Sequence, residues 1–483
     1  MEKIKQFLFI NTSIKQTIAK NTFWLFLSET SGRILKMGLV IYAARMLGVT
    51  GWGIFSYAIS VSSLLMIFSD IGIGDLVMRE MAKKKKEYQT FISTALMLKI
   101  IILLVSTLLV IFISPFISHI PEARTLFPIV ALVLFFDSMR ELGLSINRAS
   151  EKMERDMVVK TITNAVIFVL GIILLKIKLT PESVAIAYAV GSAIGFIVIA
   201  IIIRKEIKPL ISKIDNKLFK LVIKTTWPFA LITLIGTILG NVDIYMLGIW
   251  KNSAEIGLYT SVQRIQQFII IIPSTIAIAV FPLMARLANT DNKQFKMILE
   301  KTLSLIMLIG LPASLGGIIL AGQLVPLIFG QGYLGAIPIL RILMLMLLIS
   351  FPIFSLSNAI VAYNKQKKLV LAYLFGIIVN IILNIILVPK FGAVGSAITS
   401  FFSTTIITYI IWRELQFIQP FSVLSKLKKI VLASVIMACV VVLFGKMGIP
   451  VVLNIVIAIL FYFGTLIFLK EPLMQEIKTM IHL

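Results

Sequence analysis

Cysteine, histidine and charged residues are scarce in this sequence, and each scarcity excludes a class of protein. The 483 residues include one cysteine, Cys439, and two histidines, so we expect neither a disulfide framework nor a metal site. Charged residues make up 14% of the chain, whereas about a quarter is usual in a soluble domain. With 59% hydrophobic residues and a mean hydropathy of +1.02, the composition predicts a polytopic membrane protein with little length left for a soluble domain.

Motifs that carry enzyme chemistry are missing as well. No GxxxxGK[ST] phosphate-binding loop occurs, and no arrangement of a nucleophile with a base is visible. We therefore expect a protein that is not an enzyme and that needs no cofactor. The formal net charge of +24 could indicate a nucleic-acid partner, but in a membrane protein it is typical of basic cytoplasmic loops, so we expect no nucleic acid.

Fourteen apolar segments are long enough to cross a bilayer as helices. They lie at about 21–47, 53–77, 89–114, 125–145, 158–175, 183–203, 222–249, 257–283, 302–322, 336–357, 369–388, 393–412, 430–445 and 450–469. If the N-terminus is cytoplasmic, the inner segments hold 31 Lys and Arg residues and the outer loops hold 6. This asymmetry predicts a multi-pass protein of the cytoplasmic membrane with both termini in the cytoplasm.

A duplication organises these helices. Gly32 matches Gly236 and Gly53 matches Gly257 at one offset of 204 residues, and other matches follow in the same register. Both copies begin on the cytoplasmic side, which makes the repeat parallel. The sequence thus predicts an all-α fold of two six-helix lobes plus two C-terminal helices. Its expected parts are a cytoplasmic amphipathic arm (1–20), the first lobe (21–203), a basic cytoplasmic linker (204–221), the second lobe (222–412), and helices 13–14 with a cytoplasmic tail (413–483).

Several charges fall inside the predicted helices, where each is costly unless it faces another charge or water. Arg33, Lys99 and Asp137 lie about 15–18 Å along their helices, near the middle of a hydrocarbon core of about 30 Å. The deep cations outnumber the deep acids, and a phosphate-bearing substrate would supply the missing anion. The candidate substrate-binding residues are Arg33, Lys36, Lys99, Arg140 and Arg264, and the candidate charge-balancing residues are Glu29, Asp137, Glu141 and Asp243. The alternative is a set of salt bridges that only fixes helix packing.

Four segments resemble one transporter family. "GRILKMGLVIYAARMLGVTGWGIFSYAIS" and "FSDIGIGDLVMREMA" look like the first two helices of the polysaccharide exporters in the multidrug/oligosaccharidyl-lipid/polysaccharide transporter superfamily. "IGLYTSVQRI" and "FGAVGSAITSFFSTTI" resemble its helices 8 and 12. The resemblance implies a flippase that moves polyprenyl-pyrophosphate-linked oligosaccharide across the membrane by alternating access.

The resemblance also implies roles for particular residues. Arg33 falls at the place of a cavity-lining arginine in the related lipid II flippases, although Gly32 stands where serine is usual there. Arg264 is the counterpart of an arginine in helix 8, and the last two helices correspond to a pair that forms a groove for the lipid tail. The resemblance supplies no counterpart for Lys36 and Lys99.

Two other functions stay open at the level of sequence. A multidrug or cation antiporter of the same superfamily would favour unpaired acids and aromatic walls for its ligand. A non-transporting scaffold for glycan assembly would leave every midplane charge paired. The sequence does not choose a glycan or a coupling ion, and the expected partners are membrane lipid, the lipid-linked oligosaccharide and glycan polymerases or glycosyltransferases.

Overall fold

The computed structural model describes residues 14–69, 72–82, 88–150, 152–204 and 216–475, and throughout these residues it contains helices and no strands. The chain divides into two compact units, unit 1 (Met1–Gly257) and unit 2 (Leu258–Leu483). The predicted boundary in the linker 204–221 falls partly outside the described residues, and the lobe limits stay a prediction. Residues 1–13 of the predicted arm also lie outside them, while its remainder, from Ile14, is continuous with the first helix.

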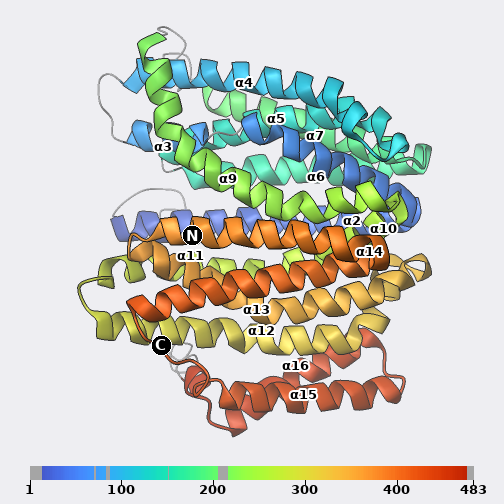
Figure 1. The fold of residues 1–483 in the computed structure, drawn as a ribbon, viewed down its shortest axis with the longest axis vertical. Coiled ribbons are helices and arrows are strands. Elements are labelled where there is room, and N and C mark those ends of the chain that lie inside the picture. Colours follow the sequence, from blue (N-terminus) through green and yellow to red (C-terminus); the bar gives the residue numbers. More distant parts are fainter. Residues whose placement is uncertain (1–13, 70–71, 83–87, 151, 205–215, 476–483) are drawn as a thin grey trace, which may run out of the picture. The chain divides into compact units, whose positions relative to one another are not determined.

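Unit 1 is built from long helices that lie alongside one another (Figure 1). They are α2 (Ile14–Met66), η1 (Ile67–Ser69), α3 (Ile73–Ala82), α4 (Tyr88–Ile117), η2 (Pro121–Leu126), α5 (Phe127–Ala149), α6 (Met153–Ile177), α7 (Pro181–Ile202) and α9 (Asn216–Trp250). α5 packs against α3, α4 and α7, so it lies inside the unit. α9 runs obliquely across its neighbours and contacts α2, α3 and α4.

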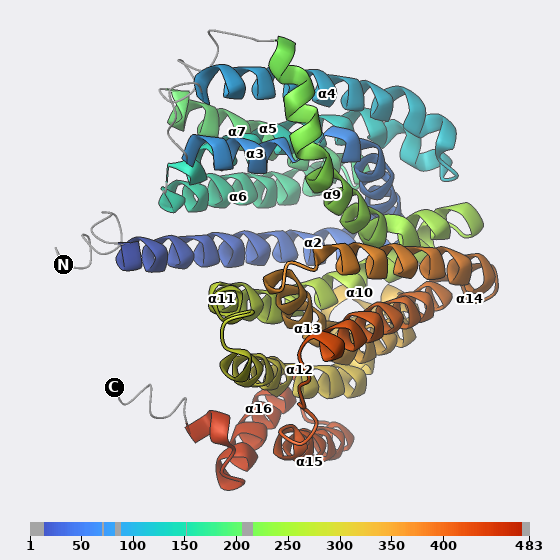
Figure 2. The ribbon, with the colours of Figure 1, turned by 60° about the vertical axis from the view of Figure 1, so that its left-hand side comes forward.

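Unit 2 begins within α10 (Ser253–Ile269). It continues with α11 (Ile271–Leu287), α12 (Asn292–Phe329), η4 (Gln331–Ala336), α13 (Ile337–Ala362), α14 (Gln366–Ile418), α15 (Lys428–Lys446) and α16 (Val451–Phe468). Helix α13 packs between α12 and α14. The last two helices pair with each other and lie against α12 (Figure 2).

Two of these helices are hairpins whose arms meet at a glycine. α2 and α14 are 53 residues long, or about 80 Å, which is far more than one bilayer crossing needs. Gly48 and Gly392 interrupt them with φ angles of 67° and 56°, in the left-handed region that favours glycine. Each helix therefore supplies two membrane passes.

Eleven helical stretches in the described part of the chain are long and apolar enough to cross a membrane. Two of these stretches belong to the glycine-broken helices α2 and α14, and each of those counts as two passes. α5 is a further pass, which the eleven do not include because it carries too many charged residues. Fourteen passes result over the described residues, at the places the hydrophobic runs predict. The expectation of a polytopic all-α membrane fold is confirmed.

Two predicted spans are interrupted inside the membrane. The second one, expected at 53–77, changes to a 3-10 turn at Ile67 and ends its first part at Ser69, and α3 resumes at Ile73. The eighth, expected at 257–283, breaks at Ile270 between α10 and α11, three residues before Pro273. Proline cannot donate the backbone hydrogen bond that would continue the helix at that point.

The repeat is visible in one close contact inside unit 1. A Cβ atom added to Gly53 would lie 1.7 Å from the carbonyl oxygen of Ser253, and one added to Gly257 would lie 1.9 Å from that of Val49. The pairs 49/253 and 53/257 are both separated by 204 residues, so the two turns pack on each other in a reciprocal way. Only glycine permits this approach of the two backbones.

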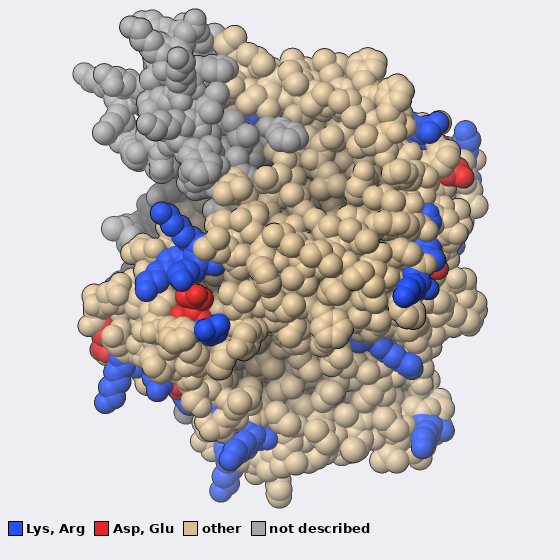
Figure 3. Space-filling view, viewed as in Figure 1, with Lys and Arg blue, Asp and Glu red and all other residues tan. Residues whose placement is uncertain are grey.

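Charged side chains avoid the middle of the helices on the face drawn in Figure 3. Blue and red side chains gather toward the two ends of the helices, and the belt between them is almost wholly uncharged. Many large apolar side chains near the middle of the helices are exposed, such as Leu104 (48%) on α4 and Leu460 (67%) on α16. Such surfaces are stable in lipid, and they agree with a multi-pass membrane protein.

Candidate functional site

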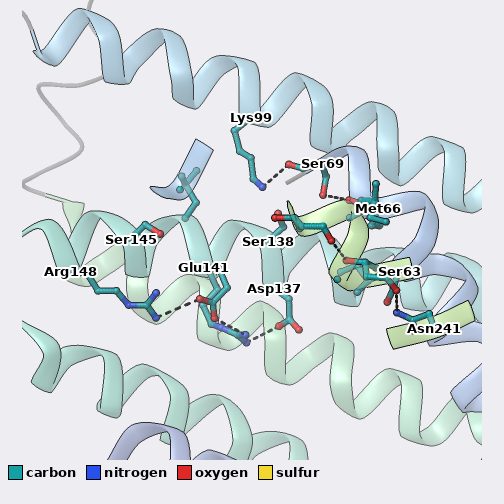
Figure 4. A pocket seen from close by; sticks show the side chains of 18 residues that line it. Ser63, Met66, Ser69, Lys99, Asp137, Ser138, Glu141, Ser145, Arg148 and Asn241 are labelled. Atoms are coloured by element: carbon teal, nitrogen blue, oxygen red, sulfur yellow. Dashed lines mark hydrogen bonds and ion pairs between the residues drawn. The ribbon is translucent and has the colours of Figure 1, made fainter. Parts of the chain in front are cut away.

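A cavity of about 780 Å³ lies within unit 1 (Figure 4). The second arm of α2, η1, α3, α4, α5 and α9 all contribute to its wall. Its lining residues are Ser63, Met66, Ile67, Ser69, Gly74, Lys99, Leu134, Asp137, Ser138, Arg140, Glu141, Leu142, Ser145, Arg148, Thr233, Gly236, Thr237 and Asn241. Among the residues that the structure describes, the wall thus holds three basic and two acidic side chains, and all of them except Arg148 fall within predicted spans.

Helix α5 supplies most of these charges because of its periodicity. Asp137, Glu141, Ser145 and Arg148 follow one another at spacings of three or four residues, so they share one helical face. The opposite faces of α5 are apolar and packed on neighbouring helices. A single polar face on an inner helix is what brings several ionised groups to one place.

The charges on α5 form a continuous chain of ion pairs. Arg140 Nη1 lies 2.7 Å from Asp137 Oδ1, and Arg140 Nη2 lies 3.7 Å from Glu141 Oε1. Arg148 Nη2 lies 3.6 Å from Glu141 Oε2, and Arg148 Nε lies 2.6 Å from Asp156 Oδ2. Two guanidinium groups and three carboxylates therefore alternate along this side of the cavity.

Neutral side chains form hydrogen bonds with the carboxylates at the two ends of this series of ion pairs. The Ser192 hydroxyl donates to Asp137 Oδ1 at 2.7 Å, and the Asn147 amide donates to Asp156 Oδ1 at 2.7 Å. The Asp156 side chain is fully buried behind the cavity wall. A buried carboxylate is tolerated here because it has both an ionic partner and hydrogen bonds.

Lys99 reaches the opposite wall of the cavity from α4. Its residue is only 3% exposed, and its Nζ donates to the backbone carbonyl of Ser69 at 2.6 Å. Ser69 is the last residue of η1, and the second span is broken between η1 and α3, where Gly72 has a φ of 74°. The helix break thus provides the acceptor that holds a buried ammonium group in place.

The third wall, on α9, is polar without charge. Thr233, Thr237 and Asn241 line the cavity at spacings of four residues. Their side chains are tied to their own helix, since Thr237 donates to the Thr233 carbonyl and Asn241 to the Thr237 carbonyl, both at 2.9 Å. Hydroxyl and amide groups of this kind suit hydroxylated ligands such as sugars.

Four of the predicted site residues meet in this cavity, namely Lys99, Asp137, Arg140 and Glu141. The others do not line it. Arg33 is 45% exposed and lies 3.6 Å from Glu29, which also pairs with Lys160 at 2.5 Å.

The remaining three predicted residues have other surroundings. Lys36 lies 5.9 Å from the centre of the Tyr188 ring. Arg264 donates to Gln267 one turn along α10, and Asp243 is buried. The structure therefore separates charges that the sequence grouped together, and among the described lining residues the cations outnumber the acids by one.

Sequence reasoning missed Arg148 and Asp156. The span predicted at 125–145 ends before Arg148, but α5 continues to Ala149 and carries Arg148 to the cavity wall. Its spacing of seven residues from Glu141 is a signal that could have found it, because residues two turns apart share a face. Asp156 meets Arg148 across the turn from α5 to α6, and no helical spacing reveals that contact.

Unit 2 contains a pocket of a different kind, with a volume of about 420 Å³. It lies between α10, α12, α13 and the last two helices, α15 and α16. Its wall is made of apolar side chains and glycines, and the exception is Tyr462, whose hydroxyl donates to the Leu308 carbonyl at 2.6 Å. The pocket suits a hydrocarbon chain. Among the residues described, no group of three or more His, Cys, Asp or Glu side chains could hold a metal ion.

The sequence is similar to proteins of glycan export. Residues 18–288 match the family described as polysaccharide biosynthesis protein, and residues 228–386 match the MatE family. A protein of Shigella flexneri named as a candidate O-antigen transporter is 24% identical over 396 residues, which cover 79% of this chain and 94% of the relative. Agl15 of Haloferax volcanii, named as a candidate low-salt glycan biosynthesis flippase, is 21% identical over 472 residues, covering 95% and 96%.

The fold is also that of solved transporters. The lipid II flippase MurJ, in an inward closed conformation, superposes with a TM-score of 0.77 at 20% identity, and the match covers 93% of this chain and 99% of that one. An inward-facing multidrug transporter of the MATE family, in the MOP superfamily, gives a TM-score of 0.60 at 14% identity, covering 86% and 97%.

Proposed function

Because the chain belongs to the polysaccharide biosynthesis protein family of the MOP (multidrug/oligosaccharidyl-lipid/polysaccharide) superfamily, we propose that it is a flippase for polyprenyl-diphosphate-linked oligosaccharide. The diphosphate and its sugars cross the membrane through a polar cavity, while the polyprenyl tail remains in lipid. The cavity opens to one side and then to the other by alternating access. The cargo comes from glycosyltransferases and is passed to glycan polymerases of surface polysaccharide biosynthesis.

The cavity of unit 1 is the observation that carries this proposal. Its volume of about 780 Å³ is in the range of small-molecule sites. Lys99 and Arg140 are buried cations on its wall, and such groups are the usual partners of phosphate. Asp137 and Glu141 hold Arg140 in place when the cavity is empty and so limit the cost of its burial.

The other predicted residues act at other stages of transport. Arg33, Lys36 and Arg264 meet the headgroup when the path has a different shape, since none of them lines the present cavity. Glu29 and Asp243 balance their charge in the empty protein. The apolar pocket beside α15 and α16 receives part of the polyprenyl tail.

An antiporter for organic cations is the second candidate, because residues 228–386 match the MatE family. A cationic ligand would meet three basic and two acidic side chains among the described residues that line the unit 1 cavity. This balance disfavours a cation and favours an anion. The flippase is therefore the better-supported function.

Reconstitution tests the two functions side by side. The purified protein is placed in liposomes that contain a fluorescent lipid-linked oligosaccharide, and its appearance in the opposite leaflet is measured with an impermeant glycosidase. A parallel sample measures the efflux of a cationic dye. Translocation of the oligosaccharide supports the flippase, whereas dye efflux without translocation contradicts it and supports the antiporter.

A further inference from the structure

The two arginines of the ion-pair chain each have one carboxylate that holds them tightly. Asp137 lies 2.7 Å from Arg140, and Asp156 lies 2.6 Å from Arg148. Both carboxylates also accept a hydrogen bond from a neutral side chain. These short, supported contacts fix the guanidinium groups in position on the cavity wall.

Glu141 is held less tightly than these two carboxylates and is more exposed. It lies between Arg148 and Asp137 along α5 (Figure 4). Its oxygens are 3.7 Å from Arg140 and 3.6 Å from Arg148, which is beyond ordinary hydrogen-bond distance. Its side chain is 46% exposed, although it lines the cavity. Glu141 is thus a loosely held anion between two firmly held cations.

The guanidinium groups retain donors on the side that faces Glu141. The Nη2 atoms of Arg140 and Arg148 both point to its carboxylate without a short contact. The Nε atom of Arg140 is buried and has no hydrogen-bond partner among the described residues. Donors without a close acceptor are costly, and an anion with several oxygens at one centre can bond to both Nη2 atoms more closely than the Glu141 carboxylate does.

We propose that Arg140 and Arg148 form a phosphate site, that Glu141 occupies it in the empty protein, and that a phosphate group of the cargo displaces the Glu141 carboxylate. The proposal rests on the flippase function and names the groups that hold its diphosphate. Displacement requires little desolvation of Glu141, because its side chain already reaches the open space of the cavity. The two arginines stay in place during this exchange, since Asp137 and Asp156 hold them from the other side.

The test is the affinity of the full-length protein, in detergent micelles, for inorganic diphosphate and for geranyl diphosphate, measured by calorimetry at constant ionic strength. Glu141→Gln removes the competing anion and keeps the shape of the side chain. We expect it to bind both probes about threefold or more tightly than the unchanged protein. Arg148→Gln should weaken binding about tenfold and cancel the gain in the double variant.

Two matched variants separate displacement from a general change in charge. Glu154→Gln removes one negative charge from another ion pair of unit 1, outside the cavity lining, and should change the affinity less than about twofold. Asp137→Asn removes one charge from the same chain but leaves Glu141 in its place. If displacement is the cause, Glu141→Gln gains more than Asp137→Asn; equal gains would overturn the proposal.

Each remaining outcome has one meaning. Equal or weaker binding by Glu141→Gln overturns the inference, and so does the absence of binding by both this variant and the unchanged protein. If the unchanged protein then still translocates lipid-linked oligosaccharide, the flippase function survives alone. A gain for inorganic diphosphate without one for geranyl diphosphate supports the anion site, but it assigns the site to a free anion and contradicts the flippase.

Discussion

The two units enclose spaces of opposite character. Among the described residues, the cavity of unit 1 is lined by five ionised side chains and a polar wall on α9, whereas the pocket of unit 2 has one polar side chain, Tyr462. The proposed cargo has the same two parts, a charged headgroup with sugars and a hydrocarbon tail. The comparison teaches that one chain can meet both parts without mixing them, because ionised side chains line the cavity of unit 1, whereas the described lining of the unit 2 pocket contains none.

The free-energy cost of forming the cavity of unit 1 therefore differs from that of forming the pocket of unit 2. Charges in unit 1 must be held by partners, since an unpaired charge within a membrane is expensive. The pocket of unit 2 needs no such partners, because its lining of glycines and aliphatic side chains contains no charge to neutralise. Substitutions should therefore act through electrostatics in unit 1 and through volume in unit 2.

The largest effect is expected at Asp156 of unit 1. Asp156→Asn removes the buried partner of Arg148 and should lower the free energy of unfolding by roughly 2–4 kcal/mol. Glu414→Gln is the control in unit 2, where Glu414 pairs with Lys368 at the surface and its loss should cost less than about 1 kcal/mol. Thermal unfolding in detergent measures both. Equal losses would contradict the contrast between buried and exposed pairs.

A large effect on transport is expected at Arg140. Arg140→Gln should reduce translocation about tenfold or more, because it removes the most buried arginine of the cavity wall. Arg140→Lys retains the positive charge but lacks the planar guanidinium group, so its translocation rate should lie between those of the unchanged protein and Arg140→Gln. Arg341→Gln, an exposed arginine on α13 outside the cavity, serves as the control. Wild-type transport by a folded Arg140→Gln protein would count heavily against the headgroup site.

A smaller effect is expected at the one polar group of the unit 2 pocket. Tyr462→Phe removes the hydrogen bond to the Leu308 carbonyl and should cost about 1 kcal/mol of stability. The pocket becomes wholly apolar, so binding of a hydrocarbon tail should not weaken. A loss of transport greater than the loss of stability explains would give Tyr462 a role in binding that its present contact does not suggest.

The smallest effect is expected from filling the same pocket. A Cβ atom on Gly316 would meet only Met437, at 3.8 Å, so Gly316→Leu projects into the pocket without distorting α12. We expect about a threefold slower transport of long-tailed cargo and unchanged binding of geranyl diphosphate. Gly322→Leu places the same side chain on the same helix outside the pocket, where no atom lies within 4 Å. Equal slowing by both variants would remove the pocket from the account.

The sequence predicts most of the fold, because hydrophobic runs and basic loops are properties of single segments. The fourteen passes and the family resemblance are confirmed, and the glycine matches at Gly53 and Gly257 correspond to a real contact. The break between η1 and α3 was not predicted, since the expected span runs through it from 53 to 77. Its consequence, a free carbonyl for Lys99, is equally invisible in the sequence.

The site is predicted less completely than the fold. Depth along a helix can be read from residue number, and four of the residues that it groups, Lys99, Asp137, Arg140 and Glu141, line one cavity. The rotation of each helix decides which charges face the cavity, and that rotation is set by packing between distant segments. Arg33 is as deep as Asp137 in the sequence, yet it lies on an exposed face with Glu29, and Arg148 reaches the cavity although it stands near the end of α5.

A structure of the protein in lipid nanodiscs with a bound polyprenyl diphosphate tests the central claim most directly. The account predicts density for the phosphates in the cavity of unit 1, within hydrogen-bond distance of Arg140 and Arg148, with the Glu141 side chain turned away from both. Phosphate density at any other place, with the ion-pair chain of α5 unchanged, would contradict it.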